Sequence, residues 1–365
     1  MTSQRQRQRA WIALGAFVAG LACAEIAVRV FARERWDPDA IRAALNPTYL
    51  HEMMRWSTDV DRYYELRPNH ELMFKGRMVR IGPDGFLAEN GEPPRDSMRV
   101  ALVGGSSTFE FGVPGDRVWG ALFCRELEAL VGRDVWMKNY SVPTYVSTQQ
   151  ASVIQREVVD WGPDLLIWHY DHRDAYPVIL DAGPVQLAPE IGDNVLHSAA
   201  WKVFVRTRRE REIERLRFKG EDTGLFENYI VDGPWYERHI DAIRRVDATA
   251  TELGLPVLFV VYDSFLHPGD GGREHFTHLH EPLLARIRTT NFLCVDLFEP
   301  LRDWMEKRGD SDQSALWLSI EPRDGHPNEL GHEVVANAVT NAIAAERVWL
   351  DALARRAAER VQKMK

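Results

Sequence analysis

The sequence predicts an α/β domain, in which helices cover both faces of a mostly parallel sheet, preceded by a hydrophobic N-terminal segment. From residue 98 onward, short apolar runs alternate with segments whose apolar residues recur at helical spacing. The apolar runs end at glycine or polar residues, as buried parallel strands that lead into helices do. This alternation over most of the chain favours a layered α/β sandwich.

The elements of the sandwich follow in order along the chain. The first core strand is expected at residues 98–104, where MRVALVG is rich in valine and ends at two glycines. Further strands are expected at 134–142, 164–170, 256–263 and 291–298. Helices are expected among them at 117–132, 148–161 and 235–254, with a closing helix at 329–350.

The composition is that of an ordinary globular protein of 365 residues. Hydrophobic residues make up 45% and charged residues 27%, which excludes wholesale disorder. The 45 basic and 54 acidic side chains give a net charge of −9, so no nucleic-acid partner is expected. Three cysteines cannot build a disulfide framework, and no local pattern of Cys or His supports a metal site.

The N-terminus predicts a basic cytoplasmic leader (1–10) and a single-pass transmembrane anchor (11–31). At about 1.5 Å per residue, the apolar segment is long enough to cross a hydrocarbon core of about 30 Å. Glu25 and Arg29 lie near its end at a spacing that lets them pair. The basic leader places the rest of the chain in the periplasm or outside the cell. Two alternatives are a signal peptide cleaved after Ala22-Cys23-Ala24 and a buried soluble helix.

Three segments lie outside the predicted core domain of residues 98–348 or interrupt it. Residues 32–97 are rich in turn formers and predict an extended arm with a short hairpin around residues 79–86 (VRIGPDGF). Residues 175–230 break the alternation and are expected to be a helical insertion, either a lid over a site or a brace facing the membrane. Residues 349–365 are expected to be a charged C-terminal tail.

Two polar clusters flank the core and suggest chemistry. Gly104-Gly105-Ser106-Ser107-Thr108 follows the first core strand, which would present a serine at the carboxyl edge of the sheet. By itself this motif fits a nucleophile, a structural turn or, more weakly, a phosphate loop. Asp324-Gly325-His326-Pro327-Asn328 precedes the last helix, and its histidine alone also fits a cap or a surface residue. A serine nucleophile needs a base and a carboxylate that orients it, and Asp324 and His326 are residues of those types.

At residues 98–346 the chain resembles the SGNH, or GDSL-like, hydrolase family, in its membrane-anchored bacterial type. VALVGGSSTFEFGV (100–113) is similar to the first block of that family, with the nucleophile at Ser106 and Gly105 in place of the usual aspartate. DGHPNELGH (324–332) resembles the last block and implies that Asp324 and His326 complete the triad. The Glu-x-x-x-Arg ending of the anchor and the IGPDGF turn also resemble tethered members. The resemblance implies a three-layer α/β/α sandwich with a flavodoxin-like sheet.

The second block of the family supplies a backbone donor to the oxyanion. NYSVPTYVSTQ (139–149) resembles this block, and Thr144 stands where the family has a glycine. The resemblance implies an oxyanion hole that includes the backbone N–H groups of Ser106 and Thr144.

The third block is where the chain departs most from the family. PDLLIWHYDHRD (163–174) is similar to it, but Arg173 replaces the asparagine that donates to the oxyanion. Arg173 or His172 is the side-chain donor that the resemblance implies, because a guanidinium and an imidazole both carry N–H groups. Arg173 can instead pair with Asp171 or Asp174 and face away.

The resemblance implies a serine ester hydrolase of the carboxylesterase or acetylesterase type that forms an acyl-enzyme. It needs no cofactor and no metal. The expected partners are an extracytoplasmic ester, with O-acetylated carbohydrates and lipids as candidates, and the membrane that holds the N-terminal helix. Two alternatives remain. One is an O-acyltransferase of cell-surface polysaccharide with the same triad, and the other is a catalytically degenerate binding or assembly protein on the same fold.

Overall fold

The computed structural model describes residues 2–31, 53–57, 59, 61–62, 64–74, 76–88, 91–171, 174, 234–261, 281–308 and 326–363. These residues fall into two compact units. The first holds the described part of residues 1–59 together with Tyr64 and Glu65, and the second holds Asp61, Arg62 and the described residues from Leu66 onward. Each unit is described by itself.

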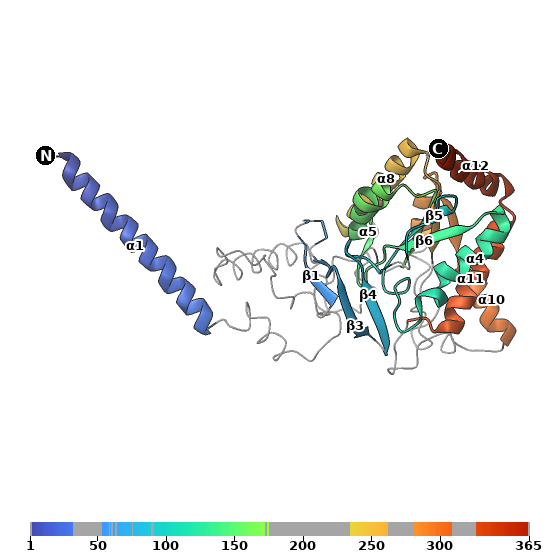
Figure 1. Ribbon diagram of the computed structural model, residues 1–365, viewed down its shortest axis with the longest axis horizontal. Coiled ribbons are helices and arrows are strands. Elements are labelled where there is room, and N and C mark those ends of the chain that lie inside the picture. The colour runs from blue at the N-terminus through green and yellow to red at the C-terminus, as the bar shows by residue number, and fades with distance from the viewer. Residues whose placement is uncertain are drawn as a thin grey trace. The chain divides into compact units, whose positions relative to one another are not determined.

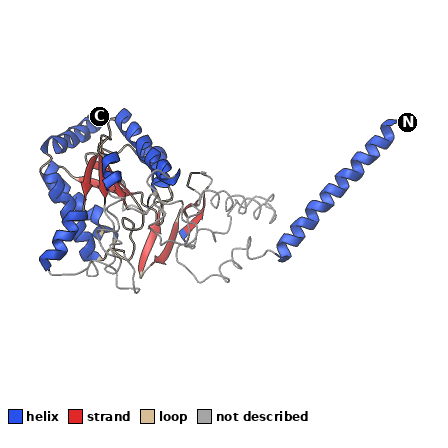
Figure 2. Ribbon diagram, turned by 180° about the vertical axis from the view of Figure 1, so that it is seen from behind, coloured by secondary structure: helices blue, strands red, loops and turns tan. Residues whose placement is uncertain are grey.

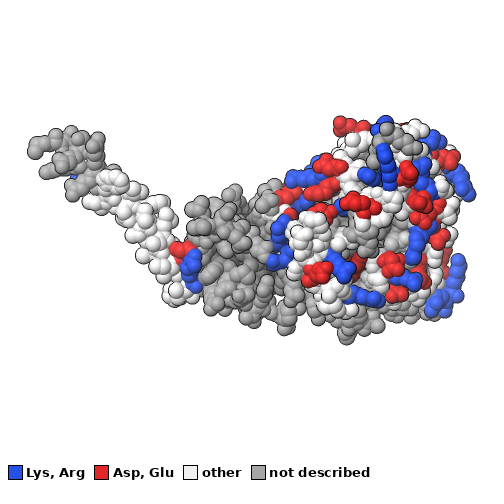
Figure 3. All heavy atoms as spheres, in the orientation of Figure 1, with Lys and Arg blue, Asp and Glu red and all other residues white. Residues whose placement is uncertain are grey.

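The first unit begins with the long helix α1 (Thr2–Phe31). Within it, Trp11–Phe31 is long and apolar enough to cross a membrane, and a signal sequence near an N-terminus would have the same properties. The described part of α1 is mostly uncharged in Figure 3. Arg29 Nε lies 2.6 Å from Glu25 Oε1, which confirms the pairing expected from their spacing.

The described part of the first unit also contains most of a two-stranded sheet, whose last residue, Leu66, is counted with the second unit. β1 (Met54–Trp56) pairs with β2 (Tyr64–Leu66) in a two-stranded sheet. Glu65 holds the two together, because one carboxylate oxygen accepts a hydrogen bond of 2.8 Å from Arg55 and the other accepts one of 2.8 Å from Ser57.

A five-stranded parallel sheet forms the centre of the second unit, which confirms the predicted fold class. Its strands are β5 (Met98–Val103), β6 (Val135–Asn139), β7 (Leu165–Tyr170), β8 (Val257–Val261) and β9 (Leu293–Asp296). They lie in the order β6-β5-β7-β8-β9, and every neighbouring pair is parallel. This is the flavodoxin-like order 2-1-3-4-5, whose direction reverses beside the first strand.

Helices pack on both faces of this sheet (Figures 1 and 2). Alternate sheet residues such as Val100, Leu102 and Ile167 form one apolar core with α4 (Trp119–Val131), α11 (Glu329–Ala344) and α12 (Arg347–Lys363). The opposite face meets α5 (Ser147–Val153) and α8 (Pro234–Leu253), where Trp168 bonds to α5 and Tyr170 packs against a histidine of α8. Successive side chains of a strand point to opposite faces of the sheet, so apolar strands such as these need helices on both faces, which gives three layers.

The remaining helices are short or lie at the ends of strands. The 3-10 turn η2 (Gly115–Arg117) leads into α4, and α10 (Phe298–Arg308) follows β9. After α5 the backbone passes through a π-helical segment, η3 (Ile154–Val158), and ends as α6 (Val159–Trp161). Together these three cover the single helix that the sequence predicts at 148–161.

The described part of the arm contains two antiparallel turns. β3 (His70–Phe74) and β4 (Arg77–Ile81) pair antiparallel, with Phe74 opposite Arg77. The segment predicted as a short hairpin, 79–86, forms the second turn, where Ile81 and Leu87 are bridged antiparallel and Gly82 N donates to Phe86 O. The glycine–proline signal in the sequence marks this second turn.

The C-terminus corrects the expectation of a charged tail at 349–365. The predicted closing helix ends at Ala344, and α12 then begins at Arg347 and runs to Lys363. Its buried residues, Leu350, Leu353, Ala357 and Val361, recur at helical spacing. Four arginines and three other charged residues lie outside this stripe of α12, and this density of charge hides the narrow apolar stripe in the sequence.

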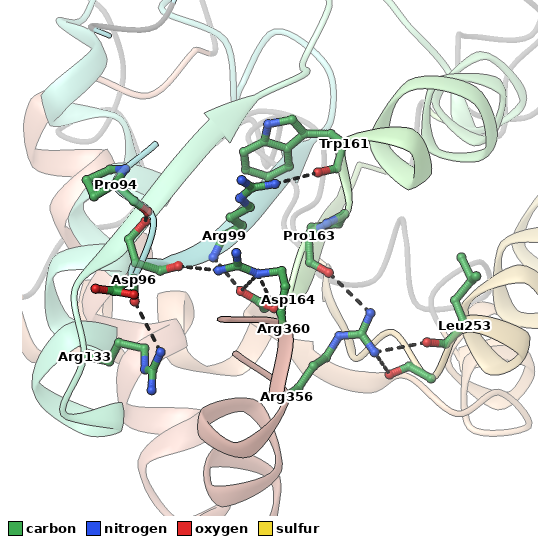
Figure 4. Close-up of polar contacts among 12 residues, drawn as sticks. Pro94, Asp96, Arg99, Arg133, Trp161, Pro163, Asp164, Leu253, Arg356 and Arg360 are labelled. Carbon is green, nitrogen blue, oxygen red and sulfur yellow. Dashed lines mark hydrogen bonds and ion pairs between the residues drawn. The ribbon is translucent and has the colours of Figure 1, made fainter. Parts of the chain in front are cut away.

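Two arginines attach α12 to the amino ends of the strands (Figure 4). Arg360 Nε lies 3.0 and 3.1 Å from the two carboxylate oxygens of Asp164, and its guanidinium also donates to Ser97 O. Asp164 accepts a further hydrogen bond from Arg99 N, at 2.9 Å. Arg356 donates to the carbonyl oxygens of Leu253, Gly254 and Pro163. These bonds join the last helix to the start of β5, the turn before β7 and the end of α8.

Candidate active site

The turn after β5 presents Ser106 at the carboxyl edge of the sheet. Thr108 closes this turn, since its backbone N–H and its hydroxyl both donate to Gly105 O, at 3.3 and 2.8 Å. A Cβ at Gly104 would lie 2.4 Å from Thr108 Oγ1, so the close approach requires glycine there. A Cβ at Gly105 would meet its nearest atom, Tyr145 O, at 3.6 Å, an ordinary contact. A Cβ could therefore be added at Gly105 without a steric clash.

His326 lies within hydrogen-bond distance of Ser106. The distance from His326 Nε2 to Ser106 Oγ is 2.8 Å, although the two residues are 220 positions apart. His326 lies just before α11, whose start is fixed by Asn328, because Asn328 Oδ1 accepts a hydrogen bond of 2.8 Å from Gly331 N. With Nε2 unprotonated, the imidazole can accept the serine proton.

Three of the expected site residues lie outside the described residues. They are Asp324, the proposed orienting carboxylate, and His172 and Arg173, the proposed side-chain donors. The helical insertion at 175–230 also lies outside them. The structure brings together Ser106 and His326 and describes the loop that carries Thr144.

Thr144 has a left-handed backbone, with φ of +67°. Such a conformation is uncommon for a β-branched residue, and it is one that glycine adopts freely. The Thr144 hydroxyl donates to Pro143 O at 2.6 Å, and Tyr145 N donates to Val142 O at 3.2 Å. The backbone at Thr144 thus keeps the shape that suits the glycine of the second block.

Asn139, which ends β6, ties the Thr144 loop to the Ser106 turn. Its Nδ2 donates to Thr108 O at 2.8 Å, and its Oδ1 accepts from Ser141 N at 2.9 Å. Val142 N donates to Gly104 O at 3.2 Å and adds a second link. In the sequence, Asn139 is only a single polar residue at the end of an apolar strand. Such a residue is equally typical of a cap, so its role between the two loops could not be predicted.

A buried polar network holds the loop after β7. Gln150 Nε2 donates to Asp174 Oδ2 at 3.0 Å and to Tyr145 O at 3.1 Å, while Gln150 Oε1 accepts from the Trp168 indole at 2.6 Å. Asp174 Oδ2 also accepts from Asp171 N at 3.2 Å. One glutamine therefore links the loop beside Thr144 to the loop that carries Arg173. The sequence does not reveal this, because Gln150 lies in a segment that reads only as a helix.

An aromatic ring covers one face of the histidine. The rings of Phe111 and His326 are stacked, with centroids 3.7 Å apart and planes 16° apart. Phe111 belongs to the FEF segment that follows the Ser106 turn, and an aromatic residue in such a run is usually interpreted as core. The contact joins residues far apart in the chain, so no local period indicates it.

A second histidine lies beneath the site and stays neutral. His332 Nδ1 accepts a hydrogen bond of 3.1 Å from Trp119 N, the first residue of α4. Burial, together with the weaker repulsion from the neighbouring His169 and His326, lowers the pKa of His332 to about 3. His332 therefore acts as a hydrogen-bond acceptor for α4 at neutral pH.

Two cysteines of the second unit carry no thiolate at neutral pH. Burial raises the pKa of both the Cys124 and the Cys294 thiols, and nearby carboxylates raise them further. In the described part of the chain, no group of three or more Cys, His, Asp and Glu side chains is placed to hold a metal ion.

No protein-family model matches the chain, and no curated protein matches it at a significant level. Its structure is similar to that of a lipolytic protein of the G-D-S-L family from Desulfitobacterium hafniense, at 13% identity and a TM-score of 0.39, over 67% of this chain and 99% of that one. It is also similar to Axe2, an acetylxylan esterase from Geobacillus stearothermophilus, at 13% identity and a TM-score of 0.43, over 67% and 94% of the two chains. A third similar structure is the esterase EstA from Pseudoalteromonas sp., at 10% identity and a TM-score of 0.39, over 67% and 96%. One of these three neighbours is described as a member of the G-D-S-L family, which the sequence blocks of this chain resemble, and the other two are described as esterases.

Proposed function

We propose that this protein is a serine ester hydrolase of the SGNH type, with Ser106 as nucleophile and His326 as general base. The observation that carries the proposal is the 2.8 Å hydrogen bond between His326 Nε2 and Ser106 Oγ at the carboxyl edge of a parallel sheet. Active residues of open α/β sheets gather at this edge, and the pair has the distance that proton transfer requires.

In the proposed reaction, His326 Nε2 takes the Ser106 proton while Oγ attacks the ester carbonyl carbon. The tetrahedral intermediate collapses, and the histidine gives its proton to the departing alcohol. Water then attacks the acyl-serine and loses a proton to His326. The second tetrahedral intermediate collapses, His326 returns that proton to Ser106 Oγ, and the acid is released. Asp324 is assigned to orient the imidazole and to support its charge, since a base in such a site needs a carboxylate partner.

The developing oxyanion is assigned to the backbone N–H groups of Ser106 and Thr144, with Arg173 or His172 as a side-chain donor. The left-handed backbone at Thr144 supports this assignment, because it keeps the conformation of a glycine in that loop. Such donors act most strongly where charge appears only in the transition state, and each is worth about 10²–10³ in turnover.

We assign the substrate to an ester outside the cytoplasm, with residues 11–31 as an uncleaved anchor. The basic leader and the apolar stretch Trp11–Phe31 support that topology. An O-acetylated carbohydrate is the first substrate to test, and a lipid ester is the second. Axe2, one of the similar structures, is described as an acetyl-xylooligosaccharide esterase.

The deciding experiment labels the full-length chain, in detergent micelles, with a fluorophosphonate probe. We expect covalent labelling of the wild type and of Ser107→Ala, and none of Ser106→Ala. Ser107 is a matched control because it lies in the same turn and is itself buried. A wild type that is folded, as judged by a cooperative thermal transition, but takes no label would overturn the hydrolase and favour a binding or assembly protein.

A second assay separates hydrolysis from transfer. The unlabelled wild-type enzyme is given an acetylated oligosaccharide with and without a non-acetylated oligosaccharide acceptor, and released acetate and acetylated acceptor are both measured. Acetate release that is unaffected by the acceptor is the expected result. Acetyl transfer that exceeds acetate release would contradict hydrolysis and identify an acyltransferase with the same triad.

A further inference from the structure

The stack of Phe111 on His326 belongs to a larger aromatic cluster that reaches into the β3–β4 hairpin. The Phe74 ring, at the end of β3, meets the Phe111 ring edge-on, with centroids 4.9 Å apart and planes 87° apart. Phe74 also meets Phe109 edge-on, at 6.3 Å and 78°. Phe74 and Phe109 are buried, whereas Phe111 and His326 are half-buried. Phe111 thus contacts both the Phe74 ring and the imidazole of His326.

We propose that Phe111 is a positioning residue for His326, and that the β3–β4 hairpin supports the active site through Phe74. The inference rests on the proposed function, in which His326 is the base. It extends the active site beyond the core domain to a hairpin that lies before the first core strand.

The stack limits how the imidazole can turn. The Ser106 proton must arrive in the plane of the ring at Nε2, so a tilt of the imidazole toward Phe111 moves the lone pair off Ser106 Oγ. With planes only 16° apart and centroids at 3.7 Å, the phenyl ring fills the space that such a tilt would use on that side. Fixing a catalytic group in its reactive orientation raises the rate without changing how tightly substrate binds.

The stack also favours the charged form of the base. When His326 takes the serine proton it becomes an imidazolium, and the negative face of a phenyl ring attracts a cation at this distance. The neutral form gains less from the ring. Phe111 should therefore raise the pKa of His326 and stabilise the transition state, in which the positive charge develops.

The hairpin makes a second contact, on the histidine side of the site. Arg77 Nη2, at the start of β4, lies 3.7 Å from Glu329 Oε1 in the first turn of α11. Both side chains are about half exposed, so this pair adds little stability. It does show that the hairpin spans from the segment after Ser106 to the helix that follows His326. Phe74 therefore supports Phe111 where the segment after Ser106 meets the segment around His326.

The test compares four variants of the full-length chain in detergent micelles. Phe111→Leu keeps an apolar side chain of similar reach but removes the flat ring, and Phe111→Tyr keeps the ring. Phe74→Leu removes the outer ring. Phe86→Leu is the matched control, since Phe86 is a buried aromatic of the same arm that packs edge-on against Tyr140.

Two readouts are measured for each variant. The first is the pair kcat and KM for an acetylated substrate. The second is the pKa of His326, obtained from the pH dependence of deuterium exchange at its C2 carbon by mass spectrometry, which requires no turnover.

We expect Phe111→Leu to lower kcat about 10–100-fold with little change in KM, as loss of orientation does. The pKa of His326 should fall by about half a unit, the size of a partly exposed cation–π contact. Phe111→Tyr should restore both quantities, Phe74→Leu should show smaller changes of the same sign, and Phe86→Leu should match the wild type.

A Phe111→Leu protein with the wild-type kcat and the wild-type pKa of His326 would overturn the inference. Equal losses in Phe111→Leu and Phe86→Leu, with no shift of that pKa, would also overturn it and leave only a structural role. If the wild type neither labels nor hydrolyses, the proposed function fails while the exchange measurement still decides this inference. A lowered pKa in Phe111→Leu then supports the hold of Phe111 on the imidazole, and an unchanged pKa overturns it.

Discussion

At the scale of single residues, Thr144 carries the clearest conflict between residue type and backbone. A β-branched residue with φ of +67° costs about 1–3 kcal/mol of local strain, which glycine avoids. We expect Thr144→Gly to raise the free energy of unfolding by about 1 kcal/mol, after the entropy that glycine adds to the unfolded chain. Turnover should stay within a few-fold, because the backbone N–H is retained.

Urea unfolding and steady-state kinetics measure the two effects at Thr144. Asn69→Gly is the control, because Asn69 also has a positive φ, of +54°, but asparagine tolerates it. A loss of turnover above 100-fold in Thr144→Gly would show that the side chain, and not the backbone, serves the site.

His332 predicts a dependence of stability on pH. Its pKa is about 3 in the folded chain against 6.5 ordinarily, so the unfolded chain binds the extra proton as pH falls. The stabilisation is complete above about pH 6.5 and is lost progressively toward pH 3, with a slope of at most about 1.4 kcal/mol per pH unit. His332→Asn, which keeps an acceptor near Trp119 N, should remove this part of the slope. Urea unfolding from about pH 5 to about pH 7.5 measures it, and an unchanged slope would contradict the assignment.

The contact between Ser106 and His326 could be expected from sequence, because each residue stands in a short motif with a characteristic neighbourhood. The glycine turn around Ser106 and the segment around His326 both have local signatures. Phe111 could not be predicted, because its role depends on a contact with a residue that is distant in sequence. Gln150 could not be predicted for a similar reason. Its three partners are Tyr145 in the loop after β6, Trp168 in β7 and Asp174 in the loop after β7.

At the scale of elements, α5 holds the two loops that flank the site. Gln150→Leu would leave the Trp168 indole N–H, Tyr145 O and the Asp174 carboxylate without this partner. Each such buried group costs about 1–3 kcal/mol, so we expect a loss of at least about 2 kcal/mol in the free energy of unfolding. Turnover should fall as well, because the loops beside Thr144 and Arg173 lose their common link.

Gln155→Leu is the control for that substitution. Gln155 lies one turn further along, is half-buried and makes one hydrogen bond of 3.3 Å to Thr249, so a loss below about 1 kcal/mol is expected. Urea unfolding of both variants is the measurement. Equal losses would show that the network around Gln150 has no special weight.

The ion pair between Arg360 of α12 and Asp164 shows why this helix belongs to the domain. Asp164 is 1% exposed, and Arg360→Ala would leave its carboxylate without the guanidinium that meets both oxygens. Breaking a buried pair in this way costs about 3–5 kcal/mol. Arg355→Ala removes an exposed charge from the same helix and should change the free energy of unfolding by less than about 0.5 kcal/mol. Thermal or urea unfolding compares the two, and similar values would refute the importance of the Asp164 pair.

At the scale of the whole molecule, the alternation of strands and helices was enough to predict the layered α/β sandwich, and the resemblance to a known family implied the flavodoxin-like sheet. Burial on both faces gives each core strand a continuous apolar run, which is easily recognised. The β3–β4 hairpin and the separate helix α12 were not predicted, because close turn signals and dense surface charge mask the local pattern.

The N-terminus provides the test at this scale. For an uncleaved anchor, intact-mass measurement of the purified protein should include residues 1–24, and the protein should require detergent for extraction from membranes. The core domain should be digested by protease added to cells whose outer barrier has been opened. A mature chain that begins at Glu25 would contradict the anchor and indicate a signal peptide.

The separation of Ser106 and His326 by 220 positions has a consequence for biosynthesis. The serine leaves the ribosome with the first core strand, whereas the histidine arrives with the penultimate helix, after all five strands of the sheet. A growing chain therefore lacks the proposed general base until it is nearly complete. The last described helix then returns to the beginning of the first core strand, since Arg360 donates to Ser97 O. Contacts of such long range make folding slow, so we expect the proposed catalytic pair to form only at this late step.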